Sequence, residues 1–268
     1  MYNDFKLKSH YNISDLLSIM ELLRSENGCP WDKEQTHASI RKKFIEEAYE
    51  AVEAIDMQNP EMLKEELGDV LLQVVFHTQI EKEVGSFNFD DVCDGICKKL
   101  VLRHPHIFKD IKVNNTDDVL NNWESIKKVE KGQTTYTQAL NAVPKVLPSL
   151  MRSEKVQSRA AKSGFDYNNI ELAISDLESE LLELKQAIKN NDISNQKEEL
   201  GDLLFSVCNV ARFLKLDSEE CLSESCNKFI SRFEQVENIA KEKNVALNDC
   251  DFSELDAFWK QAKNKLKK

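Results

Sequence analysis

A six-residue segment, KEELGD, occurs twice in this 268-residue chain, at 64–69 and again 133 residues later at 197–202. When the same offset is extended upstream without a gap, an E-x-x-E pair at 47–50 aligns with a second E-x-x-E pair at 180–183. Each half therefore contains E-x-x-E followed, after the same interval, by E-x-x-D. A duplicated pattern of this length predicts two copies of one folding unit.

Further segments repeat in the same order around these acidic pairs. Upstream, an amphipathic segment that Ser14 is predicted to cap stops at Gly28, and a second one begins at Pro148 and stops at Gly164. Each half is predicted as a helix, a glycine stop, two acidic helices, a basic helix and a helix that carries Trp. Downstream, pairs with four-residue spacing match between the halves, Lys99 and Arg103 with Lys228 and Arg232, and Trp123 and Lys127 with Trp259 and Lys263.

Turn-forming residues are scarce, with 7 Gly and 5 Pro in the chain. A β-rich fold of this length needs more of them at its turns, so the composition predicts an all-α protein. Together with the repeat, it predicts a tandem pair of helical-bundle modules. Pro144 and Pro148 mark the stretch between the halves, and we expect an N-terminal module at 1–135, a linker at 136–150 and a C-terminal module at 151–268.

The chain is acidic, with 36 Lys and Arg against 47 Asp and Glu and a formal net charge of −11. Nucleic-acid binding depends on basic residues that neutralise phosphates, so this balance argues against a nucleic-acid partner. No stretch approaches the roughly 18 apolar residues that cross a membrane, and residues 1–12 have no apolar signal core. We therefore expect a cytoplasmic protein without a membrane partner. The seven Cys include no C-x-x-C pair, which favours buried reduced thiols.

The acidic pairs of the first half lie on two predicted helices joined by the short loop MQNPE. Asn59 is suited to cap the second helix and Pro60 to occupy its first position, which predicts an antiparallel hairpin. Residues three apart on a helix lie on one side, so each pair presents two carboxylates together. Packing of the apolar stripes brings the pairs into register. Apolar residues surround Asp69 and Asp202, which predicts that these helices and their carboxylates are buried.

Four carboxylates in one buried place repel one another and lose hydration unless a cation compensates them. Ligation by carboxylate oxygens alone suits Mg²⁺, with Mn²⁺ as a substitute, rather than zinc or copper. Each half is therefore predicted to hold a divalent metal through four residues, Glu47, Glu50, Glu66 and Asp69 in the first and Glu180, Glu183, Glu199 and Asp202 in the second.

The repeated basic and aromatic residues supply what a phosphate ligand of that metal needs. Magnesium takes part of its coordination from substrate phosphates. The Lys-x-x-x-Arg pairs put two cations on one helical face, and Trp123 and Trp259 offer stacking surfaces one turn before Lys127 and Lys263. Metal, cations and an aromatic surface together indicate a site for a nucleotide polyphosphate.

Two other functions fit parts of the pattern. A ferritin-like di-metal bundle normally uses Glu-x-x-His pairs, whereas Asp69 and Asp202 stand at the fourth position here. One or both halves could instead be a non-catalytic module that senses nucleotides, and tight binding of a nucleoside triphosphate without hydrolysis would identify it. For His104 and His106, which flank Pro105, local packing is favoured over metal ligation.

Eight segments, spread over nearly the whole chain, match the sequences of one known family. They are GCPWDKEQTH (28–37), FIEEAYE (44–50), KEELGDVLLQVVFH (64–77), RHPHIF (103–108), NWESIKKVEK (122–131), RAAKSGFDY (159–167), KEELGDLLFSVCNVAR (197–212) and NKFISRFEQVE (227–237). These segments resemble the MazG family of nucleoside triphosphate pyrophosphohydrolases. The resemblance implies tandem all-α MazG modules, assembled as a homodimer, that hydrolyse nucleoside and deoxynucleoside triphosphates to the monophosphate and pyrophosphate with Mg²⁺.

The resemblance also implies roles for single residues. The metal ligands of the family fall on the eight carboxylates already named. Glu46 is the candidate general base of the first module, and Ser179 stands at the equivalent position of the second. The implied nucleotide contacts of the second module are Asp176, Ser179, Asn195, Lys197, Glu198, Lys228, Arg232 and Trp259.

Overall fold

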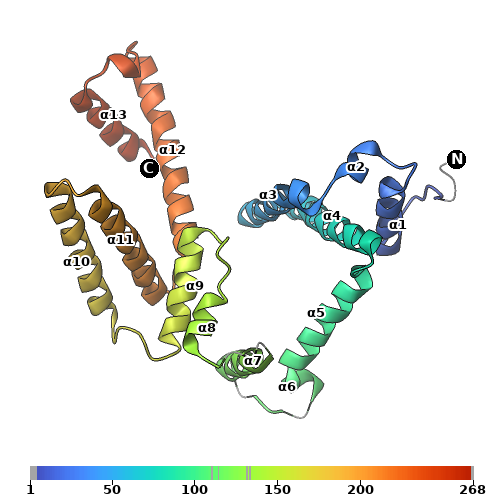
Figure 1. Cartoon of the computed structure of the whole chain (residues 1–268). Coiled ribbons are helices and arrows are strands. Elements are labelled where there is room, and N and C mark those ends of the chain that lie inside the picture. The colour runs from blue at the N-terminus through green and yellow to red at the C-terminus, as the bar shows by residue number, and fades with distance from the viewer. Residues whose placement is uncertain (1–4, 110, 114, 131, 133, 267–268) are drawn as a thin grey trace. The chain divides into compact units, whose positions relative to one another are not determined.

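Every regular element in the described part of the chain is a helix, as the composition predicted. The chain divides into two compact units, residues 1–127 and residues 128–268. Figure 1 labels their helices along the chain. The computed structural model describes the chain in five stretches, 5–109, 111–113, 115–130, 132 and 134–266.

Unit 1 follows the order predicted from the repeat. Its acidic helices α3 and α4 pack side by side as an antiparallel pair, α1 lies against α4, and α5 leaves the far end of α4 (Figure 1). Two short helices, α2 and α6, were not predicted. The helices are α1 (Ile13–Arg24), α2 (Pro30–Glu34), α3 (His37–Asp56), α4 (Pro60–Val84), α5 (Phe89–Arg103), α6 (Pro105–Phe108) and α7 (Thr116–Glu130), the last of which runs into unit 2.

The predicted hairpin between α3 and α4 is confirmed. The side chain of Asn59 accepts a hydrogen bond from the backbone N–H of Met62 at 3.3 Å, and Pro60 is the first residue of α4. Pro has no backbone N–H group, and this costs nothing at the first position, because the first N–H groups of a helix have no acceptor within the helix. Ala51 and Ala54 are buried on α3, and such small side chains allow the two helices to approach closely.

The core of unit 1 forms where α1, α3 and α4 meet. Met20, Ile40, Val75 and Phe76 are buried together, and Phe89 at the start of α5 packs against them. Apolar burial of about 25 cal/mol per Å² makes such a cluster the main source of stability for a unit of this size. The core therefore fixes the C-terminal half of α4 and the first turn of α5.

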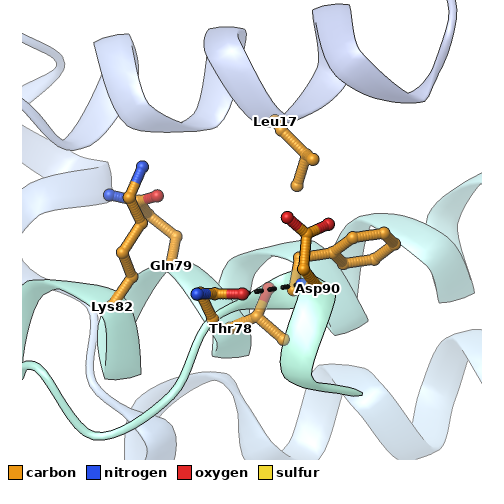
Figure 2. Close-up of a pocket in the computed structure, with 7 residues that line it drawn as sticks. Leu17, Thr78, Gln79, Lys82 and Asp90 are labelled. Atoms are coloured by element: carbon orange, nitrogen blue, oxygen red, sulfur yellow. Dashed lines mark hydrogen bonds between the residues drawn. The ribbon is translucent and has the colours of Figure 1, made fainter. Parts of the chain in front are cut away.

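A small cavity of about 180 Å³ remains between α1, α4 and the first turn of α5 (Figure 2). Leu17 reaches it from α1 and Lys82 from α4, and Asp90 lies at its α5 side. The side chain of Asn88 accepts a hydrogen bond from the Asp90 N–H at 2.8 Å, so a cap holds the beginning of α5 here.

Arg24 connects the end of α1 to α2 and α4. Its Nε and Nη2 each donate to the carboxylate of Glu83 at 2.8 Å, and its Nη1 donates to the carbonyl oxygens of Asp32 at 2.5 Å and Gln35 at 3.1 Å. The chain can turn back toward Arg24 only with glycine at residue 28, since a Cβ there would lie 2.2 Å from the Leu23 carbonyl oxygen. Gly28, Asp32 and Gln35, within the segment from 28 to 37, therefore have a structural role.

Unit 2 repeats the arrangement. The hairpin of α10 and α11 is again closed over small residues, Ala173 and Ala187, and α9 packs on α11. A separate core of Val236, Ile239 and Phe258 joins α12 to α13. The elements are α8 (Tyr136–Asn141), α9 (Ser149–Ala161), α10 (Ile170–Lys189), α11 (Ile193–Leu214), α12 (Ser218–Glu242), a 3₁₀ turn η1 (Leu247–Asp249) and α13 (Phe252–Lys265).

Three local predictions need correction. Asn12, rather than Ser14, caps α1, because its side chain accepts from the N–H groups of the two residues at the helix start. The stretch predicted as a linker contains α8, which Thr135 caps; Lys131 and Gln133 nearby, and residues 1–4, lie outside the described residues. All seven Cys are free, but only Cys208 is buried. Among the described helices, none is long and apolar enough to cross a membrane.

The Arg24–Glu83 pair generates a stability prediction. Arg24 lowers the pKa of Glu83 below its usual 4.5, mainly by hydrogen bonding. Glu83→Gln should lower the free energy of unfolding at pH 7 by about 1 kcal/mol, a modest loss because Glu83 is 34% exposed. Since the folded-state pKa is the lower one, the contribution is present above pH 4.5 and disappears as the pH falls through that folded-state value.

Urea unfolding of both proteins between pH 3 and pH 7 measures this difference. Glu61→Gln is the matched control, because Glu61 pairs with Lys64 at 3.0 Å with both side chains more than three-quarters exposed. A loss that persists unchanged at pH 3, or an equal loss in the control, would contradict the assignment.

Candidate metal centre

The first carboxylate cluster lies at the contact between α3 and α4. Ligand oxygens of Glu47, Glu66 and Asp69 all lie within 4.8 Å of one another. Glu50, one turn along α3, is hydrogen-bonded to Glu47. A hydrogen bond between two carboxyl groups needs a proton on one of them. The hairpin thus brings together the four residues predicted from the repeat.

Crowding of like charge changes the acidity of this cluster. The pKa of Glu47 is raised, first by burial, then by its hydrogen bond to Glu50 and by the charges of Asp69 and Glu50. The pKa of Glu66 is also raised, by burial and then by the neighbouring carboxylates, of which Glu50 has the largest effect. A divalent cation would reverse this effect, because it favours the ionised form of each group.

The second cluster has the same frame between α10 and α11. Oxygens of Glu180, Glu199 and Asp202 lie within 4.8 Å of one another. Glu183 accepts a hydrogen bond from the Ser179 hydroxyl at 3.0 Å. Burial, followed by the charge of Glu183, raises the pKa of both Glu180 and Glu199. The repeated sequence therefore builds the same cluster twice.

Asn195 also belongs to this second cluster. Its side chain donates a hydrogen bond to Glu199, which lowers the pKa of that carboxyl in opposition to the neighbouring charges. The equivalent position in unit 1 is Met62, which cannot donate. Of the other predicted contacts on α11, Lys197 and Glu198 are exposed two residues and one residue before Glu199.

The prediction that these helices and carboxylates are buried is wrong for the single chain. Glu50, Glu183 and Asp202 are exposed, and none of the other members is fully buried. Leu67 is 54% exposed and Leu200 is 50% exposed, although both lie in the apolar surroundings that suggested burial. The physical reason is that each hairpin packs against neighbouring helices on one face and leaves the other face uncovered.

The donor chemistry of both clusters fits a magnesium or manganese ion. Every candidate ligand is a carboxylate, and hard divalent cations prefer such oxygen ligands. Among the described residues, neither cluster includes a His or Cys, the donors that zinc sites usually contain. Partial exposure leaves room for the waters and phosphate oxygens that magnesium retains.

The predicted basic and aromatic residues come together in each unit. The guanidinium of Arg103 lies 5.9 Å from the ring centre of Trp123, and the ammonium of Lys127 lies 5.7 Å from the same ring. Arg232 lies 5.9 Å from the Trp259 ring. These are cation–π distances. Lys99, Lys228 and Lys263 are exposed on the same helices, α5, α12 and α13.

These basic groups lie far along their helices. Arg103 is fourteen residues beyond Phe89, the residue of α5 that packs on the core near the end of α4. Arg232 is likewise fourteen residues beyond Ser218, whose backbone N–H donates to Glu154 of α9 at 2.6 Å. At 1.5 Å per residue each separation is about 21 Å. In unit 1, α5 runs away from the α3–α4 hairpin (Figure 1).

The remaining predicted residues have identifiable partners. Glu46, the candidate general base of the first unit, pairs with Lys42 at 2.9 Å, which lowers its pKa. Asp176 accepts a hydrogen bond from the Ser206 hydroxyl at 2.8 Å. The Nδ1 atom of His104 lies 2.7 Å from the Leu100 carbonyl oxygen, in agreement with local packing.

A group of polar residues beside the second cluster was not predicted from the sequence. Gln157, Tyr167, Ser206 and Asn209 line a cavity that also contains Asp176. A signal for them exists in α11, where Ser206 and Asn209 are polar although Cys208 and Val210 around them are apolar. Such polar residues, one and two turns after Asp202, fall on the side of the helix that faces the cluster.

Comparison with known proteins agrees with this geometry. A family model described as the MazG nucleotide pyrophosphohydrolase domain matches the chain twice, over residues 35–108 and 169–237. These two stretches contain both hairpins and both carboxylate clusters.

Several curated proteins are similar over most of the chain. A nucleoside triphosphate pyrophosphohydrolase/pyrophosphatase MazG of Thermotoga maritima is 42% identical over 249 residues, 93% of this chain and 94% of that protein. A nucleoside triphosphate pyrophosphohydrolase of Escherichia coli K12 is 41% identical over 256 residues, 94% of this chain and 97% of that protein. Bacillus subtilis YabN is 46% identical over 255 residues, but the chain spans only 52% of it. With two carboxylate hairpins, two domain matches and relatives similar from end to end, the chain belongs to the MazG family of nucleotide pyrophosphohydrolases.

Proposed function

We propose that this protein is a Mg²⁺-dependent enzyme that hydrolyses nucleoside triphosphates, and the corresponding deoxynucleotides, to the monophosphate and pyrophosphate. The observation that carries the proposal is the pair of carboxylate clusters within a chain that matches the MazG domain twice. The names of the full-length relatives support the same reaction. Mn²⁺ has the same oxygen preference and should substitute.

The proposed reaction is hydrolysis of the bond between the first and second phosphates. When bound, the metal would neutralise phosphate charge and lower the pKa of an attacking water. Glu47, Glu50, Glu66 and Asp69 would hold it in unit 1, and Glu180, Glu183, Glu199 and Asp202 in unit 2. The Ser179 hydroxyl orients Glu183 through its hydrogen bond, and Asn195 orients Glu199.

Lys and Arg side chains are proposed to stabilise the charge that develops on the pyrophosphate leaving group. Lys228 and Arg232 on α12, with Lys197 on α11, are the candidates in unit 2, and Trp259 with Lys263 adds a stacking surface. Lys99, Arg103, Trp123 and Lys127 are the corresponding set of unit 1. Each set must approach the triphosphate held by a carboxylate cluster, so the position of α5 and α12 matters for activity.

A homodimer is part of the proposal. Leu200, Leu204 and Val207 form an exposed stripe along α11, spaced so that they fall on one helix face. The equivalent α4 residues include Leu67 and Leu71, which are exposed too. Exposed apolar stripes of this kind are typical of protein interfaces. A second chain that covers them would also bury the carboxylate helices, as their composition predicted.

Two modules, at 1–135 and 151–268 with a connection at 136–150, are proposed to carry the two sites. A purely regulatory role for one of them is the alternative, since unit 1 has the Glu46–Lys42 ion pair where unit 2 has Ser179. The cytoplasmic location, and the expected lack of nucleic-acid and membrane partners, stay predictions from composition.

Product analysis tests the reaction and shows which unit performs it. The wild-type protein with Mg²⁺ should convert each nucleoside triphosphate to the monophosphate and pyrophosphate. Glu183→Gln and Glu50→Gln are made separately. If the unit that contains the change is active, its kcat should fall at least about 100-fold, because a metal ligand is lost without change of size. Glu178→Gln, on α10 and outside the cluster, is the control and should retain full activity.

Formation of a diphosphate and inorganic phosphate would contradict the proposed reaction. Retention of full activity by the two single variants and by their combination would contradict the proposed metal ligands. Tight nucleotide binding without turnover would favour the sensing alternative.

Metal binding should also be visible in stability. Mg²⁺ at saturating concentration should raise Tm by about 5 °C, because it binds only the folded cluster and removes the repulsion between its carboxylates. Glu199→Gln should raise Tm without metal and lose most of the response to Mg²⁺, since one of the crowded charges is gone. Differential scanning calorimetry measures both; the Glu178→Gln control should respond like the wild type, and an equal Mg²⁺ response in Glu199→Gln would contradict the assignment.

The stripe on α11 generates a prediction for assembly. The wild-type protein should sediment as a dimer of 30.9-kDa chains. Leu204→Asp should shift it to monomers, since a charge within an apolar interface costs several kcal/mol, of order 3. Leu7→Asp is the control, because Leu7 is 89% exposed near the N-terminus and outside the stripe. A monomeric wild type, or a dimeric Leu204→Asp variant, would contradict the proposed interface.

A further inference from the structure

A short contact between two histidines joins the start of α3 to α4 in unit 1. The Nδ1 atom of His37, the first residue of α3, lies 2.6 Å from the Nδ1 atom of His77 on α4. The two ring planes are within 5° of each other, and the ring centres are 4.9 Å apart. That separation equals the nitrogen–nitrogen distance plus one ring radius on each side. The two Nδ1 atoms therefore point straight at each other.

The second ring nitrogen of His37 has a carboxylate partner. Its Nε2 atom lies 2.7 Å from Oε1 of Glu81, which is one turn after His77 on α4. Hydrogen bonds from Ser86 and from His37 lower the pKa of Glu81, so this carboxyl stays ionised in the range where histidines titrate. An ionised carboxylate can only accept a hydrogen bond. The Nε2 atom of His37 therefore carries a hydrogen and donates it to Glu81.

A single proton fits between the two Nδ1 atoms. One nitrogen must donate and the other accept, because two unprotonated nitrogens would repel each other through their lone pairs. If both rings were protonated, two N–H groups would face each other across 2.6 Å. A metal ion does not fit there either, because two metal–nitrogen bonds in line need about 4 Å between the nitrogens. The pair can thus hold one imidazolium beside Glu81, but not two.

The surroundings of His77 do not favour a second proton. Burial, followed by the charge of His37, lowers the pKa of His77, and Phe44 of α3 packs against its ring at 5.8 Å between ring centres. The helices α1, α3 and α5 pack against α4. Their charged groups near this contact are Glu21 and Arg24 of α1, which pair with Lys82 and Glu83 on other sides of α4, the exposed Arg41 of α3, and Asp90 of α5, which lines the small cavity with Thr78.

We propose that His37, His77 and Glu81 form a pH-sensitive clamp, which keeps the α3–α4 hairpin closed at neutral pH and opens when both histidines are protonated. The short loop before Pro60 joins the two helices at one end of the hairpin, and the clamp joins them at the other. A positive charge at the first residue of a helix is also unfavourable, which adds to the repulsion between two protonated rings. Opening releases the first turns of α3, while Glu47 lies ten residues further on, about 15 Å along the helix.

The equivalent positions of unit 2 carry no titratable group. With the 133-residue offset of the two hairpins, Ile170 stands in place of His37, Val210 in place of His77 and Leu214 in place of Glu81. Ile170 is likewise the first residue of its helix, α10, so the two frames correspond. Apolar side chains at these positions do not respond to protons. The clamp therefore belongs to unit 1, although both units have the same carboxylate frame.

Acid should open the clamp, and the sign of this effect separates it from the carboxylates of the same hairpin. Because the folded-state pKa of His77 lies below the usual 6.5, the stabilisation is complete above pH 6.5 and is lost as the pH falls through the folded-state value. The pKa values of Glu47 and Glu66 are raised, so acid relieves their repulsion and stabilises the hairpin. A loss of protection in α3 with falling pH therefore cannot come from these carboxylates.

Hydrogen exchange of the backbone amides of α3 between pH 5 and pH 7.5 tests the clamp. Protection factors in the first two turns should fall about tenfold on going to pH 5, which corresponds to one unit of pKa shift. A combined variant, His37→Ile with His77→Val and Glu81→Leu, carries the residues of unit 2, keeps all four carboxylates and should show no such fall. His10→Gln is the matched control, because His10 is exposed before α1, and it should behave like the wild type.

NMR titration of the histidine Cε1–H signals decides the question even if the combined variant does not fold. In the wild type, His37 and His77 should titrate in two steps at least about one pH unit apart, because they share one proton. His37→Gln removes the charge of His37 and should raise the titration midpoint of His77. Overlapping, independent titrations of the two histidines would overturn the proposal, as would an equal fall of α3 protection in the wild type and the combined variant.

Discussion

Repulsion between carboxylates held close together is the constraint on which this structure depends. In each unit three carboxylate oxygens lie within 4.8 Å of one another at the contact of two antiparallel helices. A short connection between the two helices and small buried residues such as Ala54 and Ala187 hold the carboxylates in this position. Packing elsewhere in the hairpin must offset this repulsion when no cation is bound, so stability and metal affinity are opposed at the same four positions.

The two units share this frame and differ in what lies next to it. Beside the first cluster, Glu46 is paired with Lys42, and Phe76, further along α4, packs in the core of unit 1. Beside the second, Ser179 is hydrogen-bonded to Glu183, and Asn209 borders a cavity. The ligand positions of a metal site tolerate little change in geometry, whereas the side chains around it can change while the hairpin remains. Substrate selection can thus differ between units that have the same metal-binding frame.

Long helices that are only partly covered are the second general feature. α5 and α12 begin in packed surroundings, but their basic residues lie about 21 Å further along. The carboxylate helices expose apolar stripes at equivalent positions, including Leu71 and Leu204. A single chain therefore leaves uncovered much of the surface that its composition predicted to be buried. Contacts from a second chain would account for both features at once.

The sequence by itself determined the helical class, the repeat and the carboxylate clusters, because helical periodicity and the Asn59–Pro60 start of α4 act over a few residues. Only the tertiary structure decided that the carboxylates are partly exposed and that Gln157 of α9 is buried against α11. These depend on which faces of separate helices meet, and contacts between residues as distant as Gln157 and Phe205 leave no mark in local spacing.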